Sequence, residues 1–276
     1  MTTPSRIALI AGAGRFPFHV ADEARRKGVE VTAVGIQGWA DPGLAGRVAG
    51  YAEISVGQLG RLIKHLKAQG VQQAIMAGKV TKSVLLGGRT RFDAEAALLL
   101  ARLKGDYSVP AVLGAIGRRL EREGIRLLDS STFLRQHLCP EGPLTARRPS
   151  ADEQADVRVG VRAARAVAAV DIGQTVVVKD RVVVAVEALE GTDAAIRRAQ
   201  ELAGAGLTIV KLGAPGQDRR FDLPVVGPDT AAAMAAAGVR CLALEAGIAL
   251  LLDRAALVAA LDRARIAAIG VKVDEG

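Results

Sequence analysis

Short, uninterrupted apolar runs alternate with helix-length segments throughout the first half of the chain. Three of these runs are "RIALIAGAG" (6–14), "VEVTAVGI" (29–36) and "QQAIMAGKV" (72–80). Between them, segments such as 59–68 place apolar side chains at helical spacing. Strands that are apolar at every position are typical of a parallel sheet covered by helices on both faces. The first half is therefore predicted to be a Rossmann-like α/β domain.

The second half predicts an α/β domain with a mixed sheet. Ser150 and Glu153 form a capping-box pattern that begins a helix running to about residue 168. The segment 174–189, "QTVVVKDRVVVAVEAL", is typical of a β-hairpin that turns at Asp180–Arg181. Helix and strand patterns then alternate as far as a last strand near 266–273.

The best candidate for a linker is "LCPEGPLTARRPS" (138–150), because Pro and Gly interrupt regular structure there. We therefore predict two α/β domains. Residues 1–138 would form an N-terminal Rossmann-like domain that binds a nucleotide or phosphate. Residues 139–150 would be the linker, and residues 151–276 the C-terminal α/β domain.

Composition narrows the class of protein. The two cysteines, Cys139 and Cys241, lie far apart and the three histidines are scattered, so neither a zinc site nor a disulfide framework is indicated. The start of the chain has neither the pattern of a secretory signal nor that of a membrane span. We expect a cytoplasmic protein.

The net charge of +8 has two explanations. One is an Arg-rich solvated surface, and the other is affinity for phosphates, nucleotides or anionic membrane headgroups. Nucleic acid is not an expected partner, because the chain has no dense block of Lys and Arg and only 3% aromatic residues for base stacking.

The first glycine turn, "IAGAGRFP", follows the first predicted strand and contains Gly12, Ala13 and Gly14. Such a turn presents backbone N–H groups to a phosphate. Pro17 stands where a dinucleotide-binding motif has a third Gly, and no acidic residue follows the second strand, so NAD binding is disfavoured. A phosphate site and a purely structural turn both remain open.

Lys79 follows another predicted buried strand, in "MAGKVTK". Ligands of open parallel sheets bind beyond the carboxyl ends of the strands. If this strand neighbours the first one, Lys79 and the glycine turn lie at one edge of the sheet. The alternative is an ordinary surface lysine.

The segment "GQDRRFDLPVVGPDT" (216–230) concentrates charge between glycines and prolines. Its arginines could bind phosphate, while Asp218 and Asp222 could hold a metal ion or a water molecule. Asp229 could do the same or cap the helix that follows. The alternative is a structural loop held by salt bridges.

A second acidic segment is "EALEGTDAA" (187–195). Glu187, Glu190 and Asp193 could bind a hard cation, whereas Thr192 or Asp193 could simply cap the next helix. Because the three histidines are scattered along the chain, a catalytic metal would be bound by oxygen, as Mg²⁺ or Mn²⁺ is.

These segments resemble one family nearly end to end, the LpxI-type UDP-2,3-diacylglucosamine pyrophosphatases of lipid A biosynthesis. The resemblance is carried by "IAGAGRFP", "MAGKV", "PEGPLTARRPSADEQADV", "DIGQTVVVKDRVVVAVEALEGTDA", "VKLGAPGQDRRFDLPVVGPDT" and "ALEAGIALLLD". One departure is Tyr107 in "KGDYS", where a second acidic residue would be expected after Asp106.

The resemblance implies a two-domain hydrolase of lipid A biosynthesis with its site in the cleft between the domains. With a divalent cation, Mg²⁺ or Mn²⁺, the enzyme would direct water at the sugar-side phosphorus of UDP-2,3-diacylglucosamine. The products would be UMP and 2,3-diacylglucosamine 1-phosphate. Its lipid substrate implies transient peripheral contact with the inner membrane of a Gram-negative bacterium, and a homodimer is open.

The resemblance also assigns roles to residues of this chain. Asp222, Asp218 and Asp193 would be catalytic, and Asp222 and Asp229 would bind the metal. The residues expected to bind substrate are Gly12, Ala13, Gly14, Lys79, Gln174, Thr192, Lys211 and Arg220. The main alternative is a non-catalytic module that binds a sugar nucleotide or lipid; a nucleotide-dependent oxidoreductase is a second one, disfavoured by Pro17.

Overall fold

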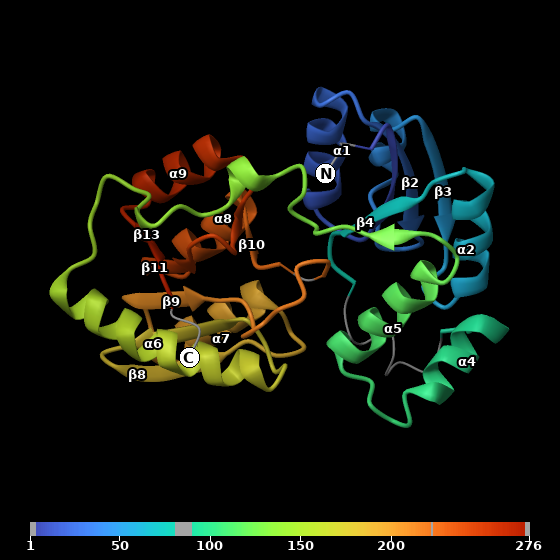
Figure 1. The fold of residues 1–276 in the computed structure, drawn as a ribbon. Helices are drawn as coiled ribbons and strands as arrows, with labels where there is room; N and C mark the ends of the chain where they lie inside the picture. Colours follow the sequence, from blue (N-terminus) through green and yellow to red (C-terminus); the bar gives the residue numbers. More distant parts are fainter. Residues whose placement is uncertain (1–3, 81–89, 222, 274–276) are drawn as a thin grey trace. The chain divides into compact units, whose positions relative to one another are not determined.

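The structure, a computed structural model, describes residues 4–80, 90–221 and 223–273 (Figure 1). It divides into two compact units. Unit 1 comprises residues 1–135 and 218–222, and unit 2 comprises residues 136–217 and 223–276. One unit has a five-stranded parallel sheet and the other a six-stranded mixed sheet, which confirms the predicted fold class.

The sheet of unit 1 has the strand order β3-β2-β1-β4-β5. Its strands are β1 (Arg6–Ala11), β2 (Glu30–Ile36), β3 (Gly50–Ile54), β4 (Gln73–Ala77) and β5 (Arg126–Leu127). Its helices are α1 (Phe16–Arg26), the 3₁₀ helix η1 (Pro42–Arg47), α2 (Leu59–Ala68), α4 (Ala94–Arg102) and α5 (Val109–Glu121). Five consecutive residues of β1, Ile7–Ala11, are buried, so this strand is covered on both faces. This burial explains why its sequence is apolar at every position rather than at every second one.

The segment 218–221, far along the chain, completes the core of unit 1. Phe221 is only 5% exposed and packs in the same apolar cluster as Leu120 and Leu127. Its ring comes within 3.5 Å of the point that a Cβ at Gly117 of α5 would occupy. The core of unit 1 therefore depends on a side chain that the sequence places among the elements of unit 2.

Unit 2 is built on a sheet with the order β6-β13-β11-β9-β7-β8, in which β9, β11 and β13 are parallel and the flanking strands are antiparallel. Its strands are β6 (Gly142–Pro143), β7 (Thr175–Lys179), β8 (Val182–Val186), β9 (Leu207–Lys211), β11 (Val239–Glu245) and β13 (Ala267–Val271), with β10 (Val225–Val226) and β12 (Leu250–Leu251) in a small second sheet. Its helices are the 3₁₀ helix η2 (Arg135–His137), which begins at the last residue of unit 1, α6 (Ala151–Ala169), α7 (Thr192–Ala203), α8 (Pro228–Ala236) and α9 (Arg254–Arg263).

The hairpin β7–β8 turns at Asp180–Arg181, as predicted. Both turn residues have positive φ angles, 50° and 67°, which are costly for residues other than Gly. A buried carboxylate of α6 compensates for this cost: Asp156 accepts a hydrogen bond from the Arg181 N–H at 2.6 Å and faces the Thr208 hydroxyl at 3.3 Å. Asp180–Arg181 is therefore a turn sequence of low intrinsic preference that a residue outside the hairpin stabilises.

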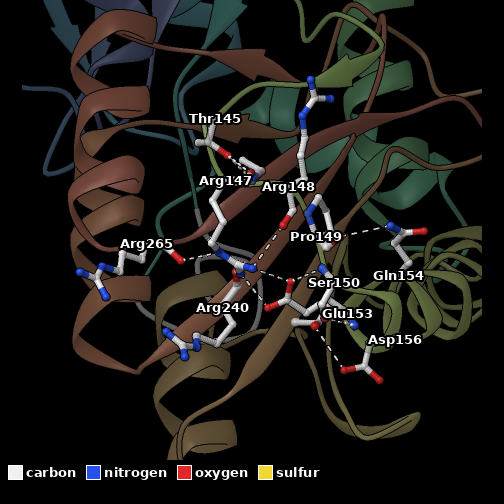
Figure 2. A network of polar contacts seen from close by, with 12 residues as sticks. Thr145, Arg147, Arg148, Pro149, Ser150, Glu153, Gln154, Asp156, Arg240 and Arg265 are labelled. Carbon is white, nitrogen blue, oxygen red and sulfur yellow. Dashed lines mark hydrogen bonds and ion pairs between the residues drawn. The ribbon is translucent and has the colours of Figure 1, made fainter.

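The segment 139–150, predicted as a linker, makes hydrogen bonds with several elements of unit 2. Its strand β6 pairs with β13, and Ser150 and Glu153 form the predicted capping box of α6. Figure 2 shows Arg147 pointing at Glu153, with guanidinium–carboxylate distances of 2.7 and 2.9 Å. The same guanidinium donates to the carbonyl oxygens of Arg240 and Arg265. Burial alone would raise the pKa of Glu153, but the hydrogen bonds from Arg147 and the Ser150 N–H lower it below its usual value.

We expect Arg147→Leu to lower the free energy of unfolding by about 2–3 kcal/mol, because it removes the guanidinium that donates to the Glu153 carboxylate and to two carbonyl groups. Arg148→Leu is the matched control, since the neighbouring side chain is exposed, and it should change stability by less than about 0.5 kcal/mol. Denaturant unfolding of both variants tests this expectation. Equal effects of the two changes would show that the Arg147 network does not stabilise unit 2.

Candidate active site

The two glycine turns of unit 1 meet at the carboxyl edge of its parallel sheet. Strands β1 and β4 are neighbours, which is the condition under which Lys79 and the first glycine turn were predicted to lie at one edge of the sheet. The Ala13 N–H donates to the Lys79 carbonyl at 2.9 Å, and the Lys79 N–H donates back to Ala13 over the same distance. Of the predicted substrate-binding residues, Gly12, Ala13, Gly14 and Lys79 are therefore brought together, with Lys79 exposed.

Two glycines of these turns, Gly12 and Gly78, are required by close packing of the backbone. A Cβ at Gly12 would lie 2.7 Å from the Lys79 carbonyl oxygen, and a Cβ at Gly78 would lie 2.7 Å from the Gly12 carbonyl carbon. Gly78 and Gly14 also have positive φ angles of 93° and 92°. Close packing explains Gly12 and Gly78, and the positive φ angle explains Gly14, so the predicted phosphate site stays a prediction.

The charged loop joins unit 1 through Ser130, which is 1% exposed. The Ser130 N–H donates to the Arg219 carbonyl at 2.9 Å. Its Oγ lies 2.8 Å from the carbonyl oxygens of both Met76 and Arg220, to either of which the hydroxyl donates. Because Met76 is in β4, the loop is attached beside the strand that leads to Lys79.

Both arginines of the loop bind carboxylates. Arg220 donates to Asp218 through Nε and one terminal nitrogen, the latter at 2.7 Å, and reaches Glu121 of α5 at 3.0 Å. The hydrogen bond from Arg220 lowers the pKa of Asp218 below its usual value. Arg219 lies 3.0 Å from Asp129. These ion pairs agree with the structural alternative for the loop, but they also hold Asp218 ionised and Arg220 oriented. Asp222, predicted to be catalytic and to bind the metal, lies outside the described residues.

A second group of predicted residues gathers in unit 2 around Lys211, the last residue of β9. Lys211 is 6% exposed, and its Nζ lies 3.0 Å from the hydroxyl oxygens of both Thr175 and Thr192. The third nearby oxygen is Oε2 of Glu187, at 3.5 Å. Gln174 joins the group through its backbone, since its carbonyl accepts the Leu212 N–H at 3.0 Å. The structure therefore unites Lys211, Thr192 and Gln174.

A buried carboxylate at the same sheet edge fixes the base of the charged loop. Glu245, the last residue of β11, accepts the Gly213 N–H at 2.8 Å and lies 3.8 Å from Arg165. The Ala214 N–H in turn donates to the Gln217 side chain at 2.9 Å. Gly213 is needed here, because a Cβ would lie 2.6 Å from the Gln217 oxygen.

Asp193 and Asp229 are exposed, each in the first turn of a helix. The alternative in which Thr192, Asp193 or Asp229 caps a helix does not hold, because the N-cap positions are Gly191 and Gly227 and neither helix has a side-chain cap. Each helix begins one or two residues earlier than a side-chain cap would require. The two carboxylates instead lie where the helix dipole favours negative charge.

Sequence reasoning missed Ser130 and Thr175, and it did not connect Glu187 or Glu245 with their partners. One signal was available for Glu245, a charged residue at the end of the apolar run "VRCLALE". Ser130 and Thr175 carry no comparable signal, since serine and threonine are common beside strands.

Family comparisons extend over nearly the whole chain. The model of the LpxI N-terminal domain matches residues 6–137, and that of the LpxI C-terminal domain matches residues 140–269. A relative from Caulobacter vibrioides, named UDP-2,3-diacylglucosamine pyrophosphatase LpxI, is 32% identical over 281 residues. The match covers 98% of this chain and 99% of the relative. Similarity is therefore found in both units.

Proposed function

Because the chain belongs to the LpxI family, we propose that it hydrolyses the pyrophosphate bond of UDP-2,3-diacylglucosamine, the substrate in the name of its Caulobacter relative. The products would be UMP and 2,3-diacylglucosamine 1-phosphate, as in lipid A biosynthesis. The observation that carries this proposal is the 32% identity, which extends over 98% of the chain. Family membership confirms the resemblance noted from the sequence.

Cleavage of a pyrophosphate requires that negative charge on its oxygens be neutralised as the bond to the leaving group breaks. We propose that Arg220 and Lys79 of unit 1 and Lys211 of unit 2 bind phosphate oxygens. In unit 1, Arg220 is the stronger candidate for binding phosphate, because Asp218 and Glu121 already orient its guanidinium. The backbone N–H groups of the turn at Gly12 to Gly14 would bind another part of the sugar nucleotide.

Mg²⁺ or Mn²⁺ is proposed as the cofactor. Within residues 4–80, 90–221 and 223–273, no three His, Cys, Asp or Glu side chains gather as a cation site. Mg²⁺ does not need such a cluster, because one or two carboxylates suffice when water and substrate phosphates supply the other ligands. Asp222 would be the first carboxylate, and the exposed Asp229 is the second candidate. A bound divalent cation would neutralise charge on the pyrophosphate and favour ionisation of water.

Asp222 is proposed to orient the attacking water toward the sugar-side phosphorus, or to bind the metal that does so. Asp218 and Asp193 rank below it. Asp218 is already engaged by Arg220, and Asp193 is exposed in the first turn of α7.

Contact with a membrane surface follows from the proposed substrate, which carries two acyl chains. The net charge of +8 would favour transient contact with anionic headgroups. In the described part of the chain, no helix has both the length and the apolar character needed to cross a bilayer.

The reaction is tested by incubating the protein with UDP-2,3-diacylglucosamine in ¹⁸O-water, with Mg²⁺, with Mn²⁺ or with EDTA, and analysing the products by mass spectrometry. We expect metal-dependent UMP and ¹⁸O in the lipid 1-phosphate. Label in UMP would retain the reaction but reverse the direction of attack. Turnover in EDTA would remove the metal from the proposal. Unchanged substrate in every arm would favour a non-catalytic module that binds a sugar nucleotide or lipid.

A further inference from the structure

Lys211 is a buried positive charge whose surroundings are built to hold it in one position. Its side chain is 8% exposed; its Nζ donates hydrogen bonds to the hydroxyls of Thr175 and Thr192, and Oε2 of Glu187 lies 3.5 Å away as an ion-pair partner. Thr175 is fully buried at the start of β7, and Thr192 is the first residue of α7. Three separate elements therefore converge on one ammonium group.

Glu187 connects the members of this cluster. Its Oε1 accepts the Thr192 hydroxyl hydrogen bond at 2.9 Å, while its Oε2 faces Lys211 at 3.5 Å. One carboxylate therefore sets both the rotamer of Thr192 and the position of the ammonium group. Because Thr192 donates to Glu187, its hydroxyl oxygen is left to accept from Lys211.

The backbone of Glu187 is itself fixed. Its N–H donates to the Thr175 carbonyl at 2.8 Å. On its other side Gly173 approaches so closely that a Cβ there would lie 2.0 Å from the Glu187 carbonyl oxygen. Because its backbone is fixed, Glu187 can hold the Lys211 ammonium group in one position.

Stability alone is a weak reason for such a cluster. A buried ion pair contributes little or nothing compared with apolar side chains of the same size, because both charges lose their hydration. Its position is informative as well: Lys211 ends a central strand, at the sheet edge where ligands of α/β proteins bind.

We infer that Glu187 is a positioning residue for the reaction, which holds the Lys211 ammonium group where it meets a phosphate oxygen of the substrate. This inference rests on the proposed function. Glu187 itself touches no reacting atom in this scheme, and it acts through Lys211.

A double-mutant cycle in the full-length protein tests the inference, with Glu187→Gln, Lys211→Met and the double variant. Gln keeps an acceptor for Thr192 but loses the charge that faces Lys211. We expect Lys211→Met to lower kcat by about 10²–10³-fold. Glu187→Gln alone should lower kcat by about 10–100-fold, with KM changed by less than about threefold. The double variant should be no slower than Lys211→Met, because Glu187 then has nothing to position.

The matched control is Asp156→Asn, which also neutralises a buried carboxylate of unit 2, but one whose hydrogen bonds within the described part of the chain go to the β7–β8 turn and to Thr208. Its kcat should stay within about twofold of the parent, whatever its unfolding midpoint. If Glu187→Gln does not fold, Glu187→Asp takes its place in the cycle.

Two results would overturn the inference while the proposed function stands. In one, the losses of the single variants multiply in the double variant. In the other, Glu187→Gln lowers the unfolding midpoint but leaves kcat unchanged. A parent protein without turnover is a different failure: it removes the proposed function and, with it, this role of Glu187.

Discussion

Asp222→Asn is expected to lower kcat by at least about 10³-fold, the largest effect on turnover that we anticipate for any single substitution. The reason is chemical, since asparagine can neither accept a proton from water nor bind Mg²⁺ with a negative charge. The fold should not change. The neighbours Phe221 and Leu223 are each 5% exposed, so apolar contacts fix the chain on both sides of the substituted residue. Steady-state kinetics with UDP-2,3-diacylglucosamine, together with an unfolding midpoint, measure both expectations.

Asp218→Asn is the companion variant from the same loop. Its carboxylate is bound by Arg220 through several hydrogen bonds, so its loss should act through the orientation of Arg220 and cost about 10–100-fold. The expected order is therefore Asp222 before Asp218. A well-folded Asp222→Asn protein with nearly normal kcat would remove Asp222 from the mechanism.

Phe221→Ala is expected to destabilise unit 1 by about 3–5 kcal/mol, the range for removing a large buried side chain from a core. It should also reduce turnover, because Phe221 is the apolar anchor next to Asp222. Amide hydrogen exchange is the appropriate measurement, since it reports on the two units separately. Amides of β4 should lose protection, while those of β9 should keep it.

Phe92→Ala is the matched control for this substitution. Phe92 also belongs to unit 1, but it is 40% exposed, so its removal should change stability by less than about 0.5 kcal/mol. If Phe221→Ala leaves exchange in unit 1 unchanged, the loop does not contribute to the core of that unit.

Local patterns were sufficient to predict most of the fold. The continuous apolar run 6–14 predicted a strand buried on both faces, and five consecutive residues of the observed strand, Ile7–Ala11, are buried. The hairpin at Asp180–Arg181 was predicted from its flanking strands, although what stabilises its turn, Asp156, lies in another helix. Hydrophobic periodicity reports on each element and its immediate neighbours, and this is the reason for its success here.

Long-range contacts within each unit were not predictable in the same way. No local pattern indicates that residues 218–221 belong with a core formed by the first half of the chain, because Phe221 is a single apolar residue between charges. The partners of Lys211 come from three segments, and their convergence depends on the order of strands in the sheet. That the site lies in a cleft between the domains stays a prediction, as do the metal and the homodimer.

The contribution of residues 218–221 to unit 1 has a consequence for synthesis of the protein. The ribosome reaches Phe221 only after it has made β6, α6, β7, β8, α7 and β9, all of which belong to unit 2. Domains usually fold in the order in which they are translated. Here the first unit cannot complete its core until most of the second has been translated. During that interval Leu120 and Leu127 lack the Phe221 side chain as a neighbour, and apolar surface exposed in this way is what chaperones bind.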